Sequence, residues 1–243
     1  MTVAGPGSAT QDGPWNREMG VRPRFMAEII AHRGANREAP ENTLAAFERA
    51  LDAGVDGIEL DIQYTLDDVP VVHHDPAIQG RPIASLSAAE VRVMKPAPSL
   101  AEVIELVNGR CRLYVEVKSA AATATVVRQL GPHSHWCAIH SFDHRVAAQT
   151  VRLNADIPVG ILLVSYLVDL PAAMRAAGAR DVWQQADYID QALVDQVHVA
   201  GGRVIAWTVN DPARSHHLVA LGVDAVCTDA PREMIRGMKR STG

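Results

Sequence analysis

Cysteine, aromatic residues and excess positive charge are all scarce in this 243-residue sequence. Its three cysteines are an odd number without CxxC spacing, which is typical of reduced thiols in a cytoplasmic protein. No apolar run approaches the ~20 residues of a membrane span, and 5% aromatic content without a basic amphipathic helix disfavours attachment to a membrane surface. The formal net charge of −5 disfavours a nucleic-acid partner, because a surface that binds phosphate backbones is normally basic.

The composition that is present, 48% hydrophobic and 21% charged residues, is that of a soluble globular protein. The first 25 residues differ, with five glycines and prolines by position 14 and no apolar stretch behind a basic start. This pattern is not that of a signal peptide, and it predicts a disordered tail over 1–25, with Met19 or Met26 as alternative initiators. Residues 26–243 show no second domain boundary and are expected to form a single domain.

Short apolar runs alternate with helical patterns from Glu28 onward, which is typical of βα units on a parallel sheet. One predicted helix starts after Thr43 and ends at Gly54, and a capping box from Ser99 to Glu102 opens another. Eight strand–helix pairs in roughly 215 residues predict an α/β fold, a single (β/α)8 TIM barrel, although an open doubly wound sheet uses the same alternation. The eight predicted strands are 29–32, 56–63, 112–118, 137–141, 158–164, 182–184, 204–208 and 225–228.

Two of these strands carry charged residues where a buried parallel strand should be apolar. Glu59 and Asp61 lie two apart and therefore share the inward face of the second strand, and Glu116 and Lys118 repeat the pattern in the third. Three inward carboxylates repel one another unless a cation neutralises them, so the pattern predicts a divalent-metal site. Oxygen donors without thiolates favour Mg²⁺, Ca²⁺ or Mn²⁺ over zinc. The alternative is a structural ion-pair cluster of these carboxylates with Lys118.

Histidines stand at the same rim as the carboxylates. The segment 69–74 follows the second strand after only the turn Leu66-Asp67-Asp68, which is too short for a parallel crossover, and it predicts a β-hairpin that extends this strand. The hairpin ends at His74 and the first strand ends at His32. Imidazole titrates near neutral pH, so these two residues form a candidate acid–base pair beside the metal. Strand parity places His73 on the opposite face, where it is expected to pack or to form a hydrogen bond.

Eight segments of the chain occur in the order and spacing of the glycerophosphodiester phosphodiesterases, which the chain resembles over about residues 28–236. They are HRG at 32–34, PENT at 40–43, ELD at 59–61, VVHHD at 71–75, EVK at 116–118, SF at 141–142, WTVN at 207–210 and TD at 228–229. The resemblance implies a TIM barrel that hydrolyses a glycerophosphodiester to glycerol 3-phosphate and an alcohol with one divalent ion. The site residues that it implies are Glu59, Asp61 and Glu116 for the metal, His32 and His74 for acid–base catalysis, Arg33 and Lys118 for the phosphate, and Glu41 in a supporting role.

Three functions remain open at this point. The first is hydrolysis of water-soluble glycerophosphodiesters, and the second is a lysophospholipase-D-like activity on lipids, which would need a broad apolar mouth. The third is a non-catalytic barrel that binds an anionic metabolite. Trp207 is expected either to fill a barrel layer or to line the alcohol pocket, and Asp229 either to hold a neighbouring side chain or to cap the turn before Pro231. The sequence indicates neither an oligomeric state nor which histidine is the base.

Overall fold

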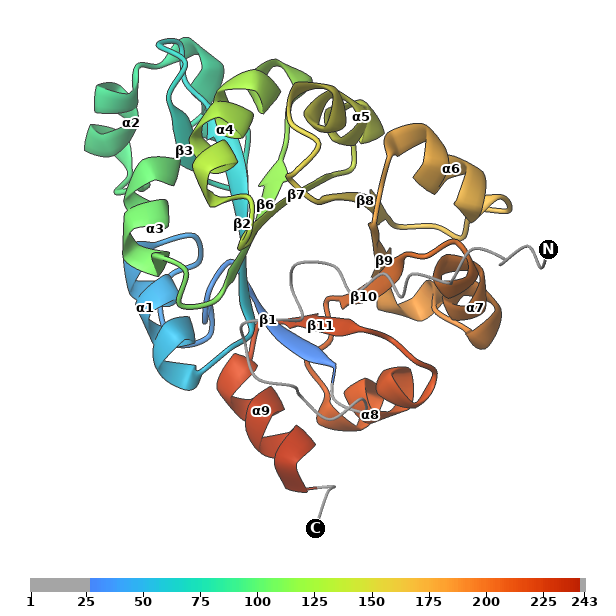
Figure 1. The fold of residues 1–243 in the computed structure, drawn as a ribbon. Helices are drawn as coiled ribbons and strands as arrows, with labels where there is room; N and C mark the ends of the chain where they lie inside the picture. The colour runs from blue at the N-terminus through green and yellow to red at the C-terminus, as the bar shows by residue number, and fades with distance from the viewer. Residues whose placement is uncertain (1–26, 241–243) are drawn as a thin grey trace, which may run out of the picture.

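The computed structural model describes residues 27–240, which form a closed barrel of parallel strands (Figure 1). Within this part of the chain, neighbouring parallel strands pair around the barrel, and β1 closes it by pairing with both β2 and β11. The strands are β1 (Glu28–His32), β2 (Gly57–Tyr64), β6 (Arg112–Val117), β7 (Cys137–Ser141), β8 (Val159–Leu163), β9 (Asp181–Gln185), β10 (Arg203–Trp207) and β11 (Ala225–Thr228). Each overlaps a predicted strand, so the TIM barrel is confirmed and the open doubly wound sheet is excluded. The tail predicted over 1–25 lies outside the described residues.

Helices form an outer ring around the strands (Figure 1). They are α1 (Leu44–Ala53), α3 (Leu100–Val107), α4 (Thr123–Leu130), α5 (His144–Leu153), α6 (Leu170–Ala177), α7 (Gln191–Val199), α8 (Pro212–Ala220) and α9 (Pro231–Arg240). The side chain of Thr43 accepts a hydrogen bond from the backbone of Ala46 at the start of α1, and Gly54 ends this helix with φ 76°. α3 opens with the predicted capping box of Ser99 and Glu102. The longest helices have ten residues, and none within 27–240 qualifies as a membrane span.

An excursion between β2 and β6 leaves the barrel and returns to it. β3 (Pro70–Val72) runs antiparallel to the last residues of β2, and β4 (Ala77–Ile78), β5 (Arg81–Pro82) and α2 (Ala88–Met94) follow. Because β3 runs back along β2, the backbone N–H of His73 reaches the carbonyl of Asp61 and donates a hydrogen bond of 3.0 Å. This return places the next residue, His74, at the level of the charged residues of β2.

The barrel interior has an apolar middle and a charged base. The middle is filled by the buried side chains of Ile30, Tyr114, Ala138, Leu162, Trp183, Ile205, Ala225 and Cys227. At the amino-terminal end of the strands, Glu28 forms ion pairs with Arg112 and Arg203. The hydroxyl of Tyr114 also donates a hydrogen bond of 3.0 Å to Glu28. The base is therefore closed by paired charges, and the opposite, carboxyl-terminal end is where polar groups can meet a ligand.

Candidate active site

Strand register brings the charged residues together at the carboxyl-terminal end of the barrel. The pairing of β1 with β2 places His32 beside Glu59, and the pairing of β2 with β6 places Asp61 beside Glu116. The three carboxylates are buried, with exposed fractions of 3%, 1% and 7% for Glu59, Asp61 and Glu116. Acidic side chains from two strands thus converge at the same end as His32, as their two-residue spacing predicts.

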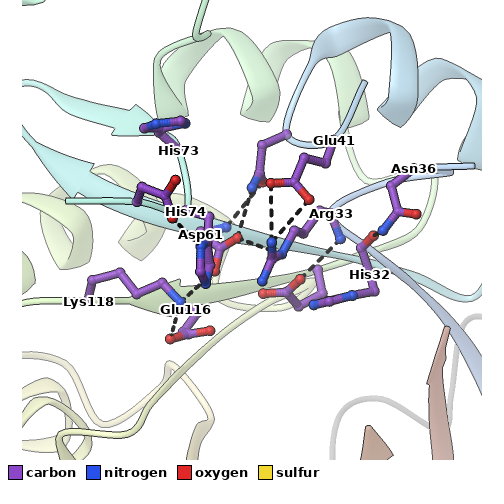
Figure 2. Close-up of polar contacts among 12 residues, drawn as sticks. His32, Arg33, Asn36, Glu41, Asp61, His73, His74, Glu116 and Lys118 are labelled. Carbon is purple, nitrogen blue, oxygen red and sulfur yellow. Dashed lines mark hydrogen bonds and ion pairs between the residues drawn. The ribbon is translucent and has the colours of Figure 1, made fainter. Parts of the chain in front are cut away.

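Lys118 and Arg33 neutralise part of this carboxylate cluster (Figure 2). Lys118 Nζ lies 2.7 Å from Asp61 Oδ1 and 2.5 Å from Glu116 Oε1. Arg33 Nε lies 3.1 Å from Asp61 Oδ2. Burial raises the pKa of Asp61, but the charges of Lys118 and Arg33 outweigh burial and lower this pKa to about 2. Burial and the neighbouring carboxylates raise the pKa of Glu116 in spite of Lys118, so the surroundings of Glu116 are still short of positive charge.

A third histidine, His140, which was not among the predicted site residues, also faces the cluster. One ligand atom from each of Glu59, Glu116 and His140 lies within 4.8 Å of the other two, a spacing that a single metal ion can bridge. Two carboxylates and an imidazole are a donor set that fits a divalent ion. Asp61 lies outside this group, with its oxygens paired to cationic side chains. The signal available in the sequence was a histidine inside the predicted strand 137–141, and the register of β6 and β7 then pairs His140 with Glu116.

Asp229 holds His32 in place. Its carboxylate lies 2.7 Å from His32 Nδ1 and accepts hydrogen bonds, also of 2.7 Å, from the amides of Asn36 and Asn210. Burial raises the pKa of Asp229, but these hydrogen bonds outweigh burial and bring the pKa well below its usual range. Burial lowers the pKa of His32, but the hydrogen bond with Asp229 and the charge of Glu59 outweigh it, and the net shift is upward. Of the two roles expected for Asp229, the structure shows that of holding a neighbouring side chain.

His74 reaches the same pocket from the excursion after β3. Its Nδ1 lies 2.8 Å from Asp75 Oδ1, and its side chain is 40% exposed. The amide of Gln63 donates a hydrogen bond of 2.9 Å to the His74 carbonyl. His73 lies apart from the cluster in Figure 2, is buried, and has its Nδ1 3.4 Å from Lys95 Nζ. Only the second of these adjacent histidines therefore faces the cluster, in agreement with the expectation from parity.

Arg33 is fixed by its backbone and by Glu41. Its backbone N–H donates a hydrogen bond of 3.1 Å to Glu59, and its Nη1 lies 3.2 and 3.1 Å from the two carboxylate oxygens of Glu41. The turn that carries it is tight, with φ 56° at Arg33 and 82° at Gly34. A Cβ at Gly34 would lie 2.8 Å from the backbone of Ala46, so this close approach to α1 requires glycine.

These groups line one pocket of about 100 Å³ at the mouth of the barrel. Its polar wall consists of His32, Arg33, Glu59, His74, Glu116, Lys118 and His140. Its apolar wall consists of Phe142, Leu162, Trp183, Trp207 and Cys227. The rings of Phe142 and Trp207 meet edge to face, with centroids 5.6 Å apart. Trp207 lines this pocket and also packs against the apolar middle of the barrel, so it has features of both roles expected for it.

Comparisons with known proteins agree with this geometry. Residues 32–233 match the model of the glycerophosphoryl diester phosphodiesterase family. The glycerophosphodiester phosphodiesterase of Caldanaerobacter subterraneus subsp. tengcongensis is 26% identical over 240 residues, which cover 87% of this chain and 98% of that protein. Glycerophosphodiester phosphodiesterase 1 of Bos taurus is 35% identical over 134 residues, which cover 46% of this chain and 40% of that protein.

A solved structure shares the fold. It is that of an Oleispira antarctica phosphodiesterase in complex with the product sn-glycerol-3-phosphate, and it matches with a TM-score of 0.82 at 24% identity. The match covers 88% of this chain and 98% of that one. Because the family model spans residues 32–233 and thus most of the sequence, this chain belongs to the glycerophosphoryl diester phosphodiesterase family and is a phosphoric diester hydrolase.

Proposed function

We propose that the protein hydrolyses glycerophosphodiesters to glycerol 3-phosphate and an alcohol, in a metal-dependent reaction with histidine acid–base catalysis. The observation that carries the proposal is the single pocket shared by His32, His74 and the carboxylates Glu59 and Glu116. Family membership supports the reaction class, and the pocket supports the assignment of roles to individual residues.

We assign the divalent ion, Mg²⁺, Ca²⁺ or Mn²⁺, to the carboxylates Glu59, Asp61 and Glu116. The burial of these three carboxylates at one end of the barrel supports the assignment, because a doubly charged ion would offset their mutual repulsion. Lys118 contacts both Asp61 and Glu116 in the structure, and we expect it to exchange one of these contacts for the substrate phosphate. When bound, a divalent ion neutralises phosphate charge and lowers the pKa of a hydroxyl group bound to it.

The two histidines transfer the protons. Since Nδ1 of His32 contacts Asp229 and Nδ1 of His74 contacts Asp75, Nε2 is the nitrogen that each ring can offer to a substrate. One histidine accepts the proton of the glycerol 2-hydroxyl as this oxygen attacks phosphorus, and the other donates a proton to the departing alcohol. The cyclic phosphate is then hydrolysed by water with the two roles reversed. Arg33, which lines the pocket beside Lys118, offsets the charge on the phosphate oxygens in the transition state.

The test is a panel of glycerophosphodiesters that differ in the alcohol, such as glycerophosphocholine and glycerophosphoethanolamine. Glycerol 3-phosphate release is measured without additive, with EDTA, and with Mg²⁺, Ca²⁺ or Mn²⁺ restored. We expect EDTA to abolish the release and an ion to restore it. His217→Ala, which removes an exposed histidine on α8, is a control that should retain full activity. Activity that survives chelation would contradict the metal assignment, and the absence of product from every diester would contradict the proposed reaction.

A second candidate, the lysophospholipase-D-like activity, is favoured by apolar side chains around the mouth. The loops after β7, β8 and β9 expose Phe142, Val164, Tyr166, Val168 and Tyr188. These loops leave the carboxyl ends of their strands, the end at which the pocket opens, so an acyl chain has apolar surface to contact there. Choline release from lysophosphatidylcholine at a higher kcat/KM than from glycerophosphocholine would establish this candidate, and the reverse order would favour the soluble substrate. A non-catalytic barrel would release choline from neither.

We also propose a cytoplasmic location and a small-molecule substrate. The three cysteines, all buried and without a disulfide, support a reducing compartment. The net charge of −5 supports the absence of a nucleic-acid partner. Fractionation of the native cells, followed by detection of the protein, tests the location.

A further inference from the structure

His140 is a buried imidazole with unused hydrogen-bonding capacity. The residue is 1% exposed, and its Nδ1 has no hydrogen-bond partner within residues 27–240. Its Nε2 lies 3.7 Å from Glu59 Oε1, which is too far for a hydrogen bond. Nε2 is thus the nitrogen that faces the carboxylates, and with no hydrogen bond formed there it is available to bind a ligand.

The fold holds this ring in one orientation. Trp183 stacks on His140 with ring centroids 4.1 Å apart and planes within 8° of parallel. Residue 160, on the strand between them, is glycine, and a Cβ at Gly160 would lie 2.9 Å from Trp183 Cδ1. The glycine therefore gives the indole the space from which it supports the imidazole. A ring held in this way presents its nitrogen atoms in fixed directions, which a metal ligand requires.

We propose that His140 is a nitrogen ligand of the metal, together with Glu59 and Glu116, and that it selects Mn²⁺ or Co²⁺ over Ca²⁺ and Mg²⁺. One ligand atom from each of these residues lies within 4.8 Å of the other two. Imidazole is a good ligand for first-row transition ions, whereas Ca²⁺ and Mg²⁺ prefer oxygen, so one nitrogen donor among carboxylates changes the order of affinities. The inference rests on the proposed function for the presence of a metal, and it adds a nitrogen donor to the carboxylate ligands assigned there.

The first experiment compares ion affinities by calorimetry. Co²⁺ and Ca²⁺ are titrated separately into the metal-free wild type, His140→Gln and His144→Gln. His144 is the matched control, because its Nε2 faces the carbonyl of Leu162 at 3.2 Å and it does not line the pocket. We expect His140→Gln to lower Co²⁺ affinity by at least the ~10-fold that loss of an outer hydrogen-bond partner already causes, and to leave Ca²⁺ affinity nearly unchanged. His144→Gln should change neither.

The second experiment detects the nitrogen ligand directly. Pulsed electron paramagnetic resonance of bound Mn²⁺ reports coupling to a coordinated imidazole nitrogen. Three histidines line the pocket, so His32→Gln, His74→Gln and His140→Gln together identify the source. We expect the coupling in the wild type and in the first two variants, and its loss in the third.

Several results would overturn the inference. They are an unchanged Co²⁺ affinity in His140→Gln, equal losses of Co²⁺ and Ca²⁺ affinity, absence of nitrogen coupling in the wild type, and loss of the coupling with His32 or His74 instead. Should His140→Gln fail to fold, the wild type and the other two variants still decide, because coupling present in all three belongs to His140. These measurements report binding and not turnover. Metal-dependent hydrolysis without nitrogen coupling refutes this inference alone, and nitrogen coupling without hydrolysis of any diester refutes the proposed function alone.

Discussion

Replacing Asp229 with asparagine removes the charge that holds His32 while it preserves the shape of the side chain. In the structure Asp229 Oδ1 accepts hydrogen bonds from His32 and Asn36, and Asp229 Oδ2 accepts one from the amide of Asn210. All three distances are 2.7 Å. An asparagine amide has a single acceptor oxygen, so its NH₂ group faces a donor whichever way the amide is turned. Asp229→Asn therefore loses both the negative charge and at least one hydrogen bond.

The size of the effect on catalysis follows from that hydrogen bond. A hydrogen bond to a charged group contributes about 1.5–3 kcal/mol, which corresponds to about 10- to 150-fold in kcat/KM if all of it acts in the transition state. The upper bound is the entire contribution of a general acid–base residue, about 10²–10⁴-fold. The side chains of His32 and Asp229 are 20% and 24% exposed, so solvent screening places the expected loss in the lower half of the range.

The pH dependence gives a second readout. Burial lowers the pKa of His32, and the hydrogen bond with Asp229 and the charge of Glu59 more than reverse this effect. Without the Asp229 carboxylate, burial is less opposed and the pKa of His32 falls. The limb of the pH–rate profile controlled by His32 should therefore move to lower pH in Asp229→Asn.

The assay is kcat/KM for a glycerophosphodiester, measured across the neutral pH range. Asp224→Asn is the matched control, because Asp224 Oδ2 lies 3.0 Å from His198 Nε2 and this aspartate–histidine pair does not line the pocket. The control should keep the wild-type profile. A folded Asp229→Asn protein with wild-type kcat/KM and an unmoved limb would refute the role that we give to Asp229.

Three further predictions concern the histidines, the metal and the base of the barrel. His32→Ala and His74→Ala should each lower kcat/KM of the folded protein by about 10²–10⁴-fold, and near-normal turnover in either variant would remove that residue from the mechanism. Glu116→Gln should abolish Mn²⁺ binding in calorimetry and the stimulation of hydrolysis by added ion, and retention of wild-type affinity would exclude Glu116 as a ligand. Glu28→Gln removes the carboxylate beside Arg203 and should lower the free energy of unfolding in urea by about 3–5 kcal/mol, whereas equal stability would show that the pair is dispensable. Burial raises the pKa of Glu28 but its arginine partners lower it further, so the advantage of the wild type should persist at neutral pH and disappear only on acidification below the usual range of that carboxyl.

Most of the barrel could be predicted because its strands carry local patterns. The predicted ranges 137–141 and 225–228 coincide with β7 and β11. The range 182–184 was one residue too short at each end, because β9 runs from Asp181 to Gln185. A charged residue normally indicates the end of a buried strand, but Asp181 is neutralised by Arg180, whose Nη2 lies 2.5 Å from Asp181 Oδ2, and by Arg203 on the neighbouring β10 at 4.0 Å. The sequence shows Arg180 and Asp181 side by side, but the contribution of Arg203 comes from a separate strand and leaves no local pattern.

The site residues could likewise be predicted where the pattern lies along one strand, and could not where it depends on contacts between strands. Alternation along β2 was enough to predict that Glu59 and Asp61 share a buried inward face. Alternation could not predict that Lys118 and Arg33 form ion pairs with the carboxylate of Asp61, because those contacts depend on the length and direction of each side chain. His140 had the parity of an inward residue, but its significance depends on neighbours from other strands that only the closed barrel brings together.

The division of the pocket into a polar and an apolar wall has a practical consequence for protein engineering. Phe142, Leu162 and Trp207 line the pocket without supplying a carboxylate, an imidazole or a cation. We expect a directed-evolution library confined to these codons to change the preference for the leaving group while the proposed catalytic and metal-binding residues stay unchanged. Substrate selectivity and catalytic rate could then be changed independently on the same scaffold.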